Sequence, residues 1–465
     1  MITTTLTLVD GVRIVVPDSL DLITPYVLQE QQDWFEDEIK FLRHLLQPGQ
    51  TIIDIGANYG VYTLSMAQAV GASGRVWAFE PATGTADLLA QGIAANRFEQ
   101  VTLERSAVSS SPGNAQLFLH ANSEFNSLVQ DQATVGDSET VTLVTLDDRR
   151  DAYGWQQIDF LKMDAEGEEH NILKGGQQFF AELSPLVQYE VKAGTDLHLE
   201  LVQAFANLGY SSYRLVPGLN LLIPFDPAVP PDGYLLNLFC CKPDRANQLA
   251  EQGFLLPSSD GLAEQEWLDQ VGEVTSYPAY DWRYTLTQWP YGATLAQLWE
   301  ETRAIGQNPE VEAALAFYRV SQDASLPIAE RFWALQASFR QFEQLCQGET
   351  AYLRWASLAR VARDYGHRSL AVTALSHLVN QILRQHLDLG EPFLAPGQRF
   401  DPIDPVTALG KWLLAAALEE LERLSFLSSF YAINEDTLQR LQAIRDLGFA
   451  SPEMERRLSL VQQFL

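Results

Sequence analysis

The feature that most constrains the fold of this chain is a regular alternation of strand-like and helix-like segments between residues 51 and 191. Strands that alternate with helices at this spacing form a parallel, doubly wound sheet, so we predict an α/β fold. Two more strand-like runs follow, and we expect them to pair antiparallel and complete a seven-stranded sheet. The strand-like runs lie at residues 51–55, 74–79, 101–104, 158–163, 186–191, 213–216 and 234–241.

The pattern changes after about residue 257, where strand signals fade and helix-like segments follow one another to the end of the chain. We therefore predict a separate all-α domain. Between Trp355 and Leu378, apolar and small residues recur with a spacing similar to that of a tetratricopeptide repeat. No convincing second copy follows one repeat length away. This stretch is therefore either an ordinary helical hairpin or part of a peptide-binding scaffold.

Length and charge narrow the functional classes. The chain has 465 residues, with 31 Lys and Arg against 60 Asp and Glu, and a formal net charge of −29. This length predicts more than one domain. Such a negative charge repels phosphate groups, so we expect neither nucleic acid nor an anionic membrane surface as a partner.

The ends and the cysteines indicate the compartment. The first residues lack the pattern of a secretory signal, and no apolar run is long enough to span a membrane. The three cysteines have neither bridging nor metal-ligand spacing, which indicates free thiols in a reducing environment. We therefore expect a cytoplasmic protein.

A glycine-containing turn follows the first strand of the alternation. In Asp54-x-Gly56-x-x-x-Gly60, the glycines allow the backbone to turn tightly and to approach a ligand closely. Glu80 ends the next strand, where an acidic side chain can accept hydrogen bonds from ribose hydroxyls. The glycine order is not that of a dinucleotide fingerprint, which disfavours a nicotinamide-dependent oxidoreductase. Two carboxylates suit the cationic sulfonium of S-adenosylmethionine better than a pyrophosphate.

These residues belong to four runs that resemble signatures of the FkbM-type methyltransferases, in the family's order and spacing. The resemblance covers about residues 30–242 and does not reach the helical half. It implies the Rossmann-like class I methyltransferase fold and methyl transfer from S-adenosylmethionine, usually to a hydroxyl. The runs are Ile-Asp-Ile-Gly-Ala-Asn-Tyr-Gly-Val-Tyr-Thr at 53–63, Phe-Glu-Pro at 79–81, Thr-Leu-Asp-Asp at 145–148, and Leu-Lys-Met-Asp-Ala-Glu-Gly-Glu-Glu at 161–169 with Leu-Lys-Gly at 173–175.

The resemblance and the glycine turn together predict the domain division and the cofactor site. We expect N-terminal strands and a helix that cap the cofactor site at 1–50, the methyltransferase domain at 51–245, a Trp-rich connection at 246–290 and the weakly tetratricopeptide-like helical domain at 291–465. The predicted contacts of S-adenosylmethionine are Asp54, Gly56, Asn58, Gly60, Glu80, Pro81, Ser106 and Ala107.

Charged residues interrupt the fourth strand, although a parallel sheet should bury that strand on both faces. Lys162 and Asp164 share one side of it, and a buried Lys needs an acidic partner. Glu166 follows at the carboxyl end of the strand, where ligands bind in this architecture, and Glu190 ends the neighbouring strand. All four are candidate catalytic residues.

Three roles stay open for these side chains. They could brace the site and orient the cofactor, one carboxylate could act as general base, or Asp164, Glu166 and Glu190 could bind Mg²⁺. An alcohol is a weak nucleophile, so methyl transfer needs either a base or a metal. His170 is a candidate substrate contact or base. Ser127, which also fits the family pattern, is either an acceptor contact or a polar loop residue.

These inferences predict an S-adenosylmethionine-dependent O-methyltransferase that acts on a hydroxyl of a saccharide or another polyhydroxylated metabolite. The acceptor is then a hydroxylated small molecule or a glycan. The helical domain holds the acceptor, forms a homodimer or binds a protein partner. The alternative is a catalytically idle methyltransferase fold that serves as a binding or scaffold protein. Intact charged positions in all the signatures favour the enzyme.

Overall fold

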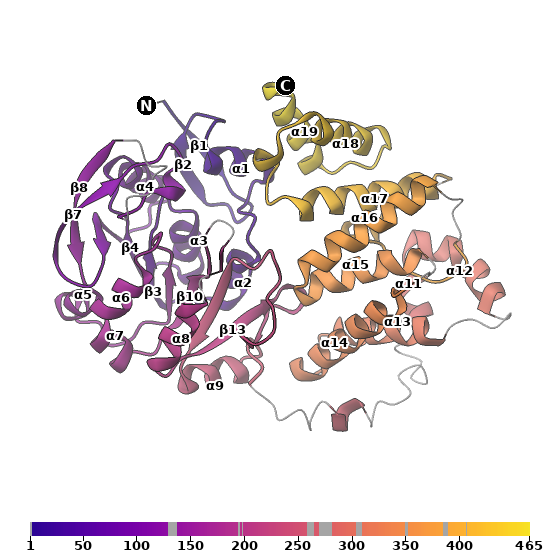
Figure 1. Cartoon of the computed structure of the whole chain (residues 1–465), viewed down its shortest axis with the longest axis horizontal. Helices are drawn as coiled ribbons and strands as arrows, with labels where there is room; N and C mark the ends of the chain where they lie inside the picture. The colour runs from indigo at the N-terminus through magenta and orange to yellow at the C-terminus, as the bar shows by residue number, and fades with distance from the viewer. Residues whose placement is uncertain are drawn as a thin grey trace. The chain divides into compact units, whose positions relative to one another are not determined.

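The computed structural model divides the chain into two compact units (Figure 1). The first comprises Met1–Leu215, Leu222–Pro231 and Leu235–Pro257, and the second comprises Val216–Leu221, Asp232–Tyr234 and Ser258–Leu465. The residues described are 2–128, 137–193, 196–197, 199–257, 265–268, 281–303, 309–348, 352–384, 389–405 and 407–465.

The first unit is built around an eight-stranded sheet whose centre is parallel, which confirms the predicted doubly wound α/β fold. Strand β15 pairs antiparallel with both β10 and β13, as expected for the last two strand-like runs. The sheet has one strand more than the predicted seven because β14 adds to the edge beyond β13. The order is β14 (Leu221–Pro224), β13 (Ser211–Val216), β15 (Asn237–Cys241), β10 (Leu186–Glu190), β9 (Phe160–Met163), β3 (Thr51–Ile55), β4 (Arg75–Phe79) and β5 (Val101–Glu104).

Strand β3 is the point at which the strand order reverses. The chain proceeds from β3 through β4 to β5 on one side, and then crosses back to β9 and β10 on the other. Ligands in open α/β sheets bind at the carboxyl ends of the strands beside such a reversal. The topology therefore places a ligand site where β3, β4 and β9 end.

Helices cover both faces of this sheet, because successive residues of a buried strand point to opposite sides. Ile53 packs in a core that includes residues of α7 and α8, whereas its neighbour Ile52 packs with residues of α2, α3 and α9. The helices of this unit are α1 (Ile23–Gln31), α2 (Asp37–Leu45), α3 (Val61–Val70), α4 (Thr83–Asn96), α5 (Leu146–Tyr153), α6 (Glu169–Gly175), α7 (Gln177–Glu182), α8 (Glu200–Asn207) and α9 (Pro243–Glu251).

Two smaller sheets accompany the large one. Strands β1 (Thr3–Thr7) and β2 (Arg13–Pro17) pair antiparallel near the N-terminus. The segment between β5 and β9 forms the second small sheet. In it, β7 (Gly113–Phe118) and β8 (Ser138–Val144) pair antiparallel, and β6 (Ser106–Val108) pairs parallel with β8.

After β9 the chain forms two short helices, α6 and α7, in place of one continuous helix. Gly176 separates them, and a Cβ at this position would crowd Phe180 and Leu146. The Asp147 carboxylate accepts hydrogen bonds from the backbone N–H groups of Gln178 and Phe179, which caps α7. This contact supplies a structural role for the Thr-Leu-Asp-Asp run, and a local helical pattern does not reveal it.

In the part that the structure describes, the second unit consists of helices that follow one another along the chain (Figure 1). Gly366, with φ +88°, ends α15 and lets the chain turn into α16, so the tetratricopeptide-like stretch forms a helical hairpin. The helices are α11 (Trp282–Leu286), α12 (Pro290–Arg303), α13 (Pro309–Ser321), α14 (Ile328–Leu345), α15 (Leu353–Tyr365), α16 (Arg368–Arg384), α17 (Leu409–Ser425), α18 (Glu435–Asp446) and α19 (Pro452–Phe464).

Two further findings bear on the sequence expectations. Among the described residues, no helix is long and apolar enough to cross a membrane. Cys240, Cys241 and Cys346 are buried free thiols.

Candidate functional site

The turn after β3 is shaped by one close backbone approach. Gly56 has φ +78°, and a Cβ there would overlap the carbonyl oxygen of Asp164 at the end of β9. The N–H groups of Gly56 and Ala57 donate to the carbonyl of Phe79 at the end of β4, at 3.1 and 3.0 Å. The turn is therefore held against both neighbouring strands, and only glycine fits at its first position.

Asp54 lies just before this turn and is almost completely buried, with 1% of its surface exposed. Its Oδ2 accepts a hydrogen bond from the Thr63 hydroxyl of α3, whereas its Oδ1 has no hydrogen-bond partner among the described residues. Burial raises the pKa of Asp54, and the charge of Lys162 on the adjacent strand opposes this shift. The free oxygen is a buried acceptor that a cationic or N–H-bearing ligand can satisfy.

Glu80 is buried beside the glycine turn and holds it in shape. Its carboxylate oxygens accept from the backbone N–H of Asn58 at 2.8 Å and of Ala82 at 2.9 Å. Burial raises the pKa of Glu80 to about 7. Asn58 has φ +48°, a left-handed conformation that Asn adopts more readily than most residues. Each Glu80 oxygen keeps a second lone pair, so these contacts leave it able to accept from a ligand.

The other predicted cofactor residues lie after β3, after β4 and on β6. Gly60, with φ +92°, precedes α3, and a Cβ there would overlap the Leu89 side chain of α4, so its first role is packing. Ser106 is 3% exposed, and its hydroxyl has no partner among the described residues. Ala107 is also buried, while Pro81 directly follows Glu80 and is partly exposed.

The carboxylates of Asp164, Glu166 and Glu190 converge, and we call them the carboxylate trio. One oxygen of each lies within 4.8 Å of the others. Burial and the neighbouring negative charges raise the pKa of Glu166 to about 8 and that of Glu190 to about 10. Like charges at this separation cannot all ionise cheaply, so the trio retains a proton near neutral pH unless a positive charge joins it.

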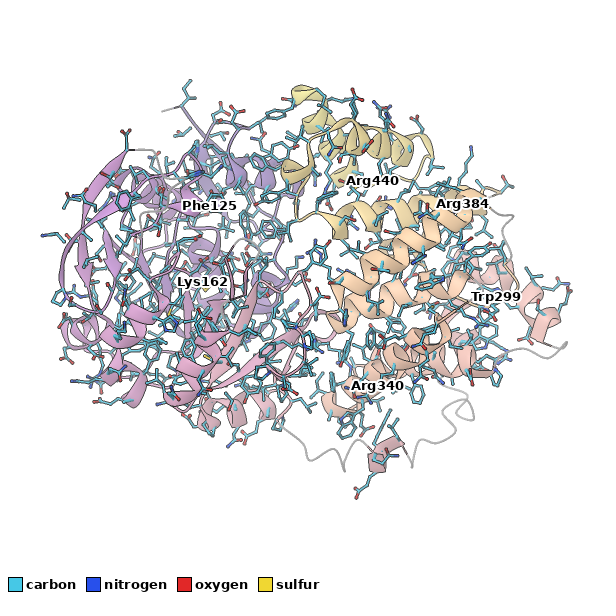
Figure 2. The ribbon with its side chains drawn as sticks, viewed as in Figure 1. Phe125, Lys162, Trp299, Arg340, Arg384 and Arg440 are labelled. Atoms are coloured by element: carbon cyan, nitrogen blue, oxygen red, sulfur yellow. The ribbon has the colours of Figure 1, made fainter. Side chains whose placement is uncertain are left out.

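Lys162 is the cation that faces the trio, and it is labelled in Figure 2. Its ammonium donates to Asp164 at 2.8 Å, with only 5% of the residue exposed. Asp164 and Asp54 raise the pKa of Lys162 above its ordinary value, although burial alone would lower it. Lys162 therefore stays protonated and stabilises the charge of the site, which argues against a role as a base.

The loop after β9, which carries Asp164 and Glu166 of the trio, is braced from two sides. Glu166 adopts φ +48°, an uncommon conformation for this residue type. The Glu169 carboxylate accepts from the backbone N–H of Ala165 at 3.0 Å and of Gly167 at 3.1 Å. Ser127 donates its hydroxyl to the carbonyl of Glu166 at 2.8 Å. Glu169 is the last acid of the Lys-x-Asp-x-Glu-Gly-x-Glu run, and its role here is to position the loop.

One acidic residue of this site was missed by the sequence reasoning. Glu36, just before α2, accepts from the Tyr62 hydroxyl, from the Trp34 indole at 3.0 Å and from Asn237 at 3.3 Å. Burial raises the pKa of Glu36 above its ordinary value, and the hydrogen bond from Tyr62 and the charge of Lys162 offset only part of this rise. The Lys162 ammonium lies 5.0 Å from the centre of the Tyr62 ring. Glu36 lies outside all four signature runs, and its sequence position shows only a helix start.

The structure thus places the glycine turn and Glu80 beside the end of β9, and it brings the three predicted catalytic carboxylates, at the ends of β9 and β10, together with Lys162. Ser127 joins them through Glu166. His170 does not, because its side chain is exposed at the start of α6 and no contact among the described residues links its ring to the trio.

Part of the chain is similar to a known protein family. The model of the methyltransferase FkbM domain matches residues 54–212. No curated protein was found to match the chain.

Solved structures resemble this chain at low sequence identity. One is a putative rRNA methylase from Clostridium thermocellum, with 10% identity, covering 45% of this chain and 95% of that one at a TM-score of 0.29. Another is an S-adenosylmethionine-dependent methyltransferase from Aquifex aeolicus, with 14% identity, 47% and 92% coverage and a TM-score of 0.28. A third is an S-adenosylmethionine-dependent O-methyltransferase from Thermotoga maritima, with 16% identity, 51% and 77% coverage and a TM-score of 0.25.

The domain match spans the turn after β3, Glu80, the trio and the strands that carry them. The part of the chain from Asp54 to Ser212 is therefore a methyltransferase domain of the FkbM type.

Proposed function

We propose that this protein transfers a methyl group from S-adenosylmethionine to a hydroxyl of a saccharide or another polyhydroxylated metabolite. The observation that carries the proposal is the coincidence of two findings. The FkbM domain match begins within β3 at the strand-order reversal, and the two sets of acidic side chains lie at the carboxyl ends of neighbouring strands of one sheet, β3 and β4 for one set and β9 and β10 for the other.

The cofactor side fits S-adenosylmethionine. The buried Asp54 Oδ1 needs a donor, which the ammonium of the methionine part supplies, and Glu80 has lone pairs left for two ribose hydroxyls. The unpaired Ser106 hydroxyl is a further buried group that a ligand can satisfy. When bound, this cofactor supplies a methyl carbon activated by its sulfonium charge.

The chain's own residues then prepare the acceptor. The attacking hydroxyl must lose its proton, and it must lie in line with the bond that breaks. Without a ligand the trio holds a proton, because Glu166 and Glu190 have raised pKa values. A nearby sulfonium charge favours ionised carboxylates. With the cofactor bound, one member of the trio, most simply Glu190, would release its proton to solvent and would then accept the proton of the attacking hydroxyl.

A divalent cation is the other way to satisfy the trio. Three carboxylates suit a hard, oxygen-preferring ion such as Mg²⁺, which would lower the pKa of a bound hydroxyl. Asp164, Glu166 and Glu190 would be its ligands. General-base and metal-assisted activation of the acceptor hydroxyl use the same three side chains. Activity measured after removal of metal therefore distinguishes the two mechanisms.

The test is a methyl-transfer assay with radiolabelled S-adenosylmethionine over a panel of glycosides, oligosaccharides and alditols, run with and without EDTA. We expect transfer to at least one glycoside. We expect Glu190→Gln to lower kcat at least roughly 100-fold, whereas the exposed Glu251→Gln in the same unit should have no effect. Activity that EDTA abolishes and Mg²⁺ restores would assign the trio to a metal.

Two outcomes would contradict the proposal. If calorimetry shows that the intact protein does not bind S-adenosylmethionine, the methyltransferase assignment is wrong. If it binds the cofactor but methylates nothing in the panel, the result favours a binding or scaffold protein with an idle methyltransferase domain.

A further inference from the structure

We propose that Phe125, with His120 beside it, is the surface on which the ring of the acceptor rests, and that this aromatic pair selects cyclic saccharides over other polyols. The proposal rests on the proposed function, because it concerns the acceptor of that same site. Phe125 is labelled in Figure 2.

Phe125 lies in a short segment, residues 120–127, that is anchored to the cofactor side of the site. The hydroxyl of Ser123 donates to the Asn58 side chain of the glycine turn at 2.9 Å. Glu124 accepts from the Thr24 hydroxyl of α1. The same carboxylate is close enough to raise the pKa of Tyr59, the residue after Asn58.

The same segment is also anchored to the acceptor side. Ser127 donates to the carbonyl of Glu166, a member of the trio, at 2.8 Å. The charge of Glu124 contributes to the raised pKa of Glu166, which places the segment within electrostatic reach of the trio. Phe125 therefore lies between one residue fixed to the cofactor turn and another fixed to the carboxylate loop.

The aromatic ring itself is the part of this segment that remains available. Phe125 is 48% exposed, and its ring meets the His120 ring edge-on with 5.3 Å between their centres. The His120 backbone N–H donates to Asn126 at 2.8 Å, which closes the loop around the pair. A single exposed Phe is ordinary on a protein surface. A Phe that lies between residues anchored to the two halves of a site is well placed to contact a ligand bound there.

The chemistry of a sugar ring matches this arrangement. A pyranose presents hydroxyls around its edge and a patch of C–H groups on its face, so it needs polar groups on one side and an apolar surface on the other. The trio supplies the polar groups, and the ring of Phe125 supplies an apolar surface. An open-chain alditol offers the same hydroxyls without a flat C–H face, so it gains less from the aromatic contact.

The experiment is steady-state kinetics on the full-length protein with three substrates. They are methyl α-D-glucopyranoside, whichever glycoside of the panel is methylated best, and the alditol glucitol. For Phe125→Ala we expect the KM of the glycoside to rise at least roughly tenfold. We expect kcat to stay within about threefold and the Kd of S-adenosylmethionine to stay unchanged. Phe125→Trp should restore the KM. The control is Tyr431→Ala, which removes an equally exposed aromatic ring from the helical unit.

The result is decisive in each direction. The inference is overturned if Phe125→Ala leaves the KM of the glycoside unchanged. It is also overturned if the KM rises but the affinity for S-adenosylmethionine falls as well. If the wild type binds S-adenosylmethionine but methylates no glycoside, saturation-transfer NMR with the same glycosides replaces kinetics. Signals present in the wild type and lost in Phe125→Ala support the aromatic contact, and their absence from the wild type contradicts it. Failure of S-adenosylmethionine to bind the wild type would instead contradict the proposed function.

Discussion

Gly56 shows how a single residue determines the distance between two strand ends. Its positive φ and the carbonyl of Asp164 leave no room for a side chain, so the turn after β3 can lie directly against the loop that carries Asp164 and Glu166. In the proposed function, this contact joins the part of the site that binds the methyl donor to the part that binds the acceptor, which must lie within a few ångströms of each other.

The first prediction tests that contact. Gly56→Ala should lower the free energy of unfolding by about 3 kcal/mol or more and abolish binding of S-adenosylmethionine, because both the backbone conformation and the space are incompatible with a Cβ. The matched control is Gly11→Ala, which has a similar φ of +85° but no atom within 4 Å of the added carbon. It should cost only about 1 kcal/mol. Urea unfolding and calorimetry measure both effects, and equal losses in the two variants would refute the role of the Asp164 carbonyl.

The second prediction concerns the two acidic residues that we propose contact the cofactor. Asp54→Asn and Glu80→Gln should each weaken binding of S-adenosylmethionine at least roughly 100-fold, because each loses a buried charged acceptor. Isothermal titration calorimetry measures the Kd. Asp87→Asn, at an exposed residue that pairs with Arg105, should leave it unchanged. If both site variants keep the wild-type affinity, S-adenosylmethionine does not bind at the turn after β3.

At the scale of elements, a row of buried polar residues crosses the centre of the sheet. Asp54 on β3 lies in register with Lys162 on β9, which lies in register with Gln188 on β10. Helix α3 covers the row through Thr63 and Tyr62. Burying such groups is costly unless they are paired, so an all-apolar row would be the more stable choice. Lys162 links the row to the site, because its ammonium donates to Asp164.

The third prediction concerns the loop between β9 and α6. Glu169→Gln should lower kcat roughly 10- to 100-fold while the protein loses about 1–2 kcal/mol of stability, because one amide oxygen replaces two carboxylate oxygens that accept from the loop. His170→Ala, one residue further along, removes an exposed side chain and should change neither quantity. Kinetics and urea unfolding measure the pair. A large loss of kcat in His170→Ala would restore that histidine as a base.

At the scale of the whole molecule, the net charge of −29 has two components. Most of the acidic groups are solvated, but several converge on the site with raised pKa values, including Glu80, Glu166 and Glu190. A carboxyl whose pKa is higher in the folded state than in the unfolded state stabilises the fold at low pH. That contribution disappears as the pH rises through the folded-state value.

The fourth prediction follows from that sign. Between pH 4.5 and pH 7, ionisation of Glu80 should remove about 3 kcal/mol from the free energy of unfolding of the unliganded protein. In Glu80→Gln this part of the pH dependence should vanish, whereas Glu251→Gln should keep it. Urea unfolding at half-unit pH steps measures the slope. Glu166 and Glu190 leave a residual slope in every variant, so a slope in Glu80→Gln equal to that of the wild type would show that Glu80 does not contribute.

The fifth prediction concerns the helical unit. Arg457 of α19 is fully buried, and its guanidinium pairs with Glu453 at 3.0 Å and with Glu422 at 3.5 Å. Arg457→Met leaves these carboxylates short of a partner and should cost about 3–5 kcal/mol of stability. Because the helical residues form a compact unit of their own, affinity for S-adenosylmethionine should be unchanged at 15 °C. Loss of affinity in a folded Arg457→Met protein would show that the two units are coupled.

The sequence by itself predicted those features that local patterns encode. Alternating strand and helix signals indicated the doubly wound sheet, and the signature runs contained Asp54, Glu80, Asp164 and Glu166. Glu190 followed from its place at the end of the neighbouring strand, because strand ends in a parallel sheet meet at one edge. Helical periodicity indicated the second unit. Each of these depends on residues close in sequence or on a topology that few alternatives satisfy.

Tertiary structure alone decided which distant residues join them. Glu36 reaches Tyr62 and Asn237 across the fold, the segment at 120–127 links the glycine turn to the loop after β9, and Asp147 caps the distant helix α7. None of these contacts leaves a periodic or spaced signal, because each joins side chains that only the packed backbone brings within hydrogen-bonding distance. The sequence therefore determined the chemistry of the site, and packing determined how its two halves are held together.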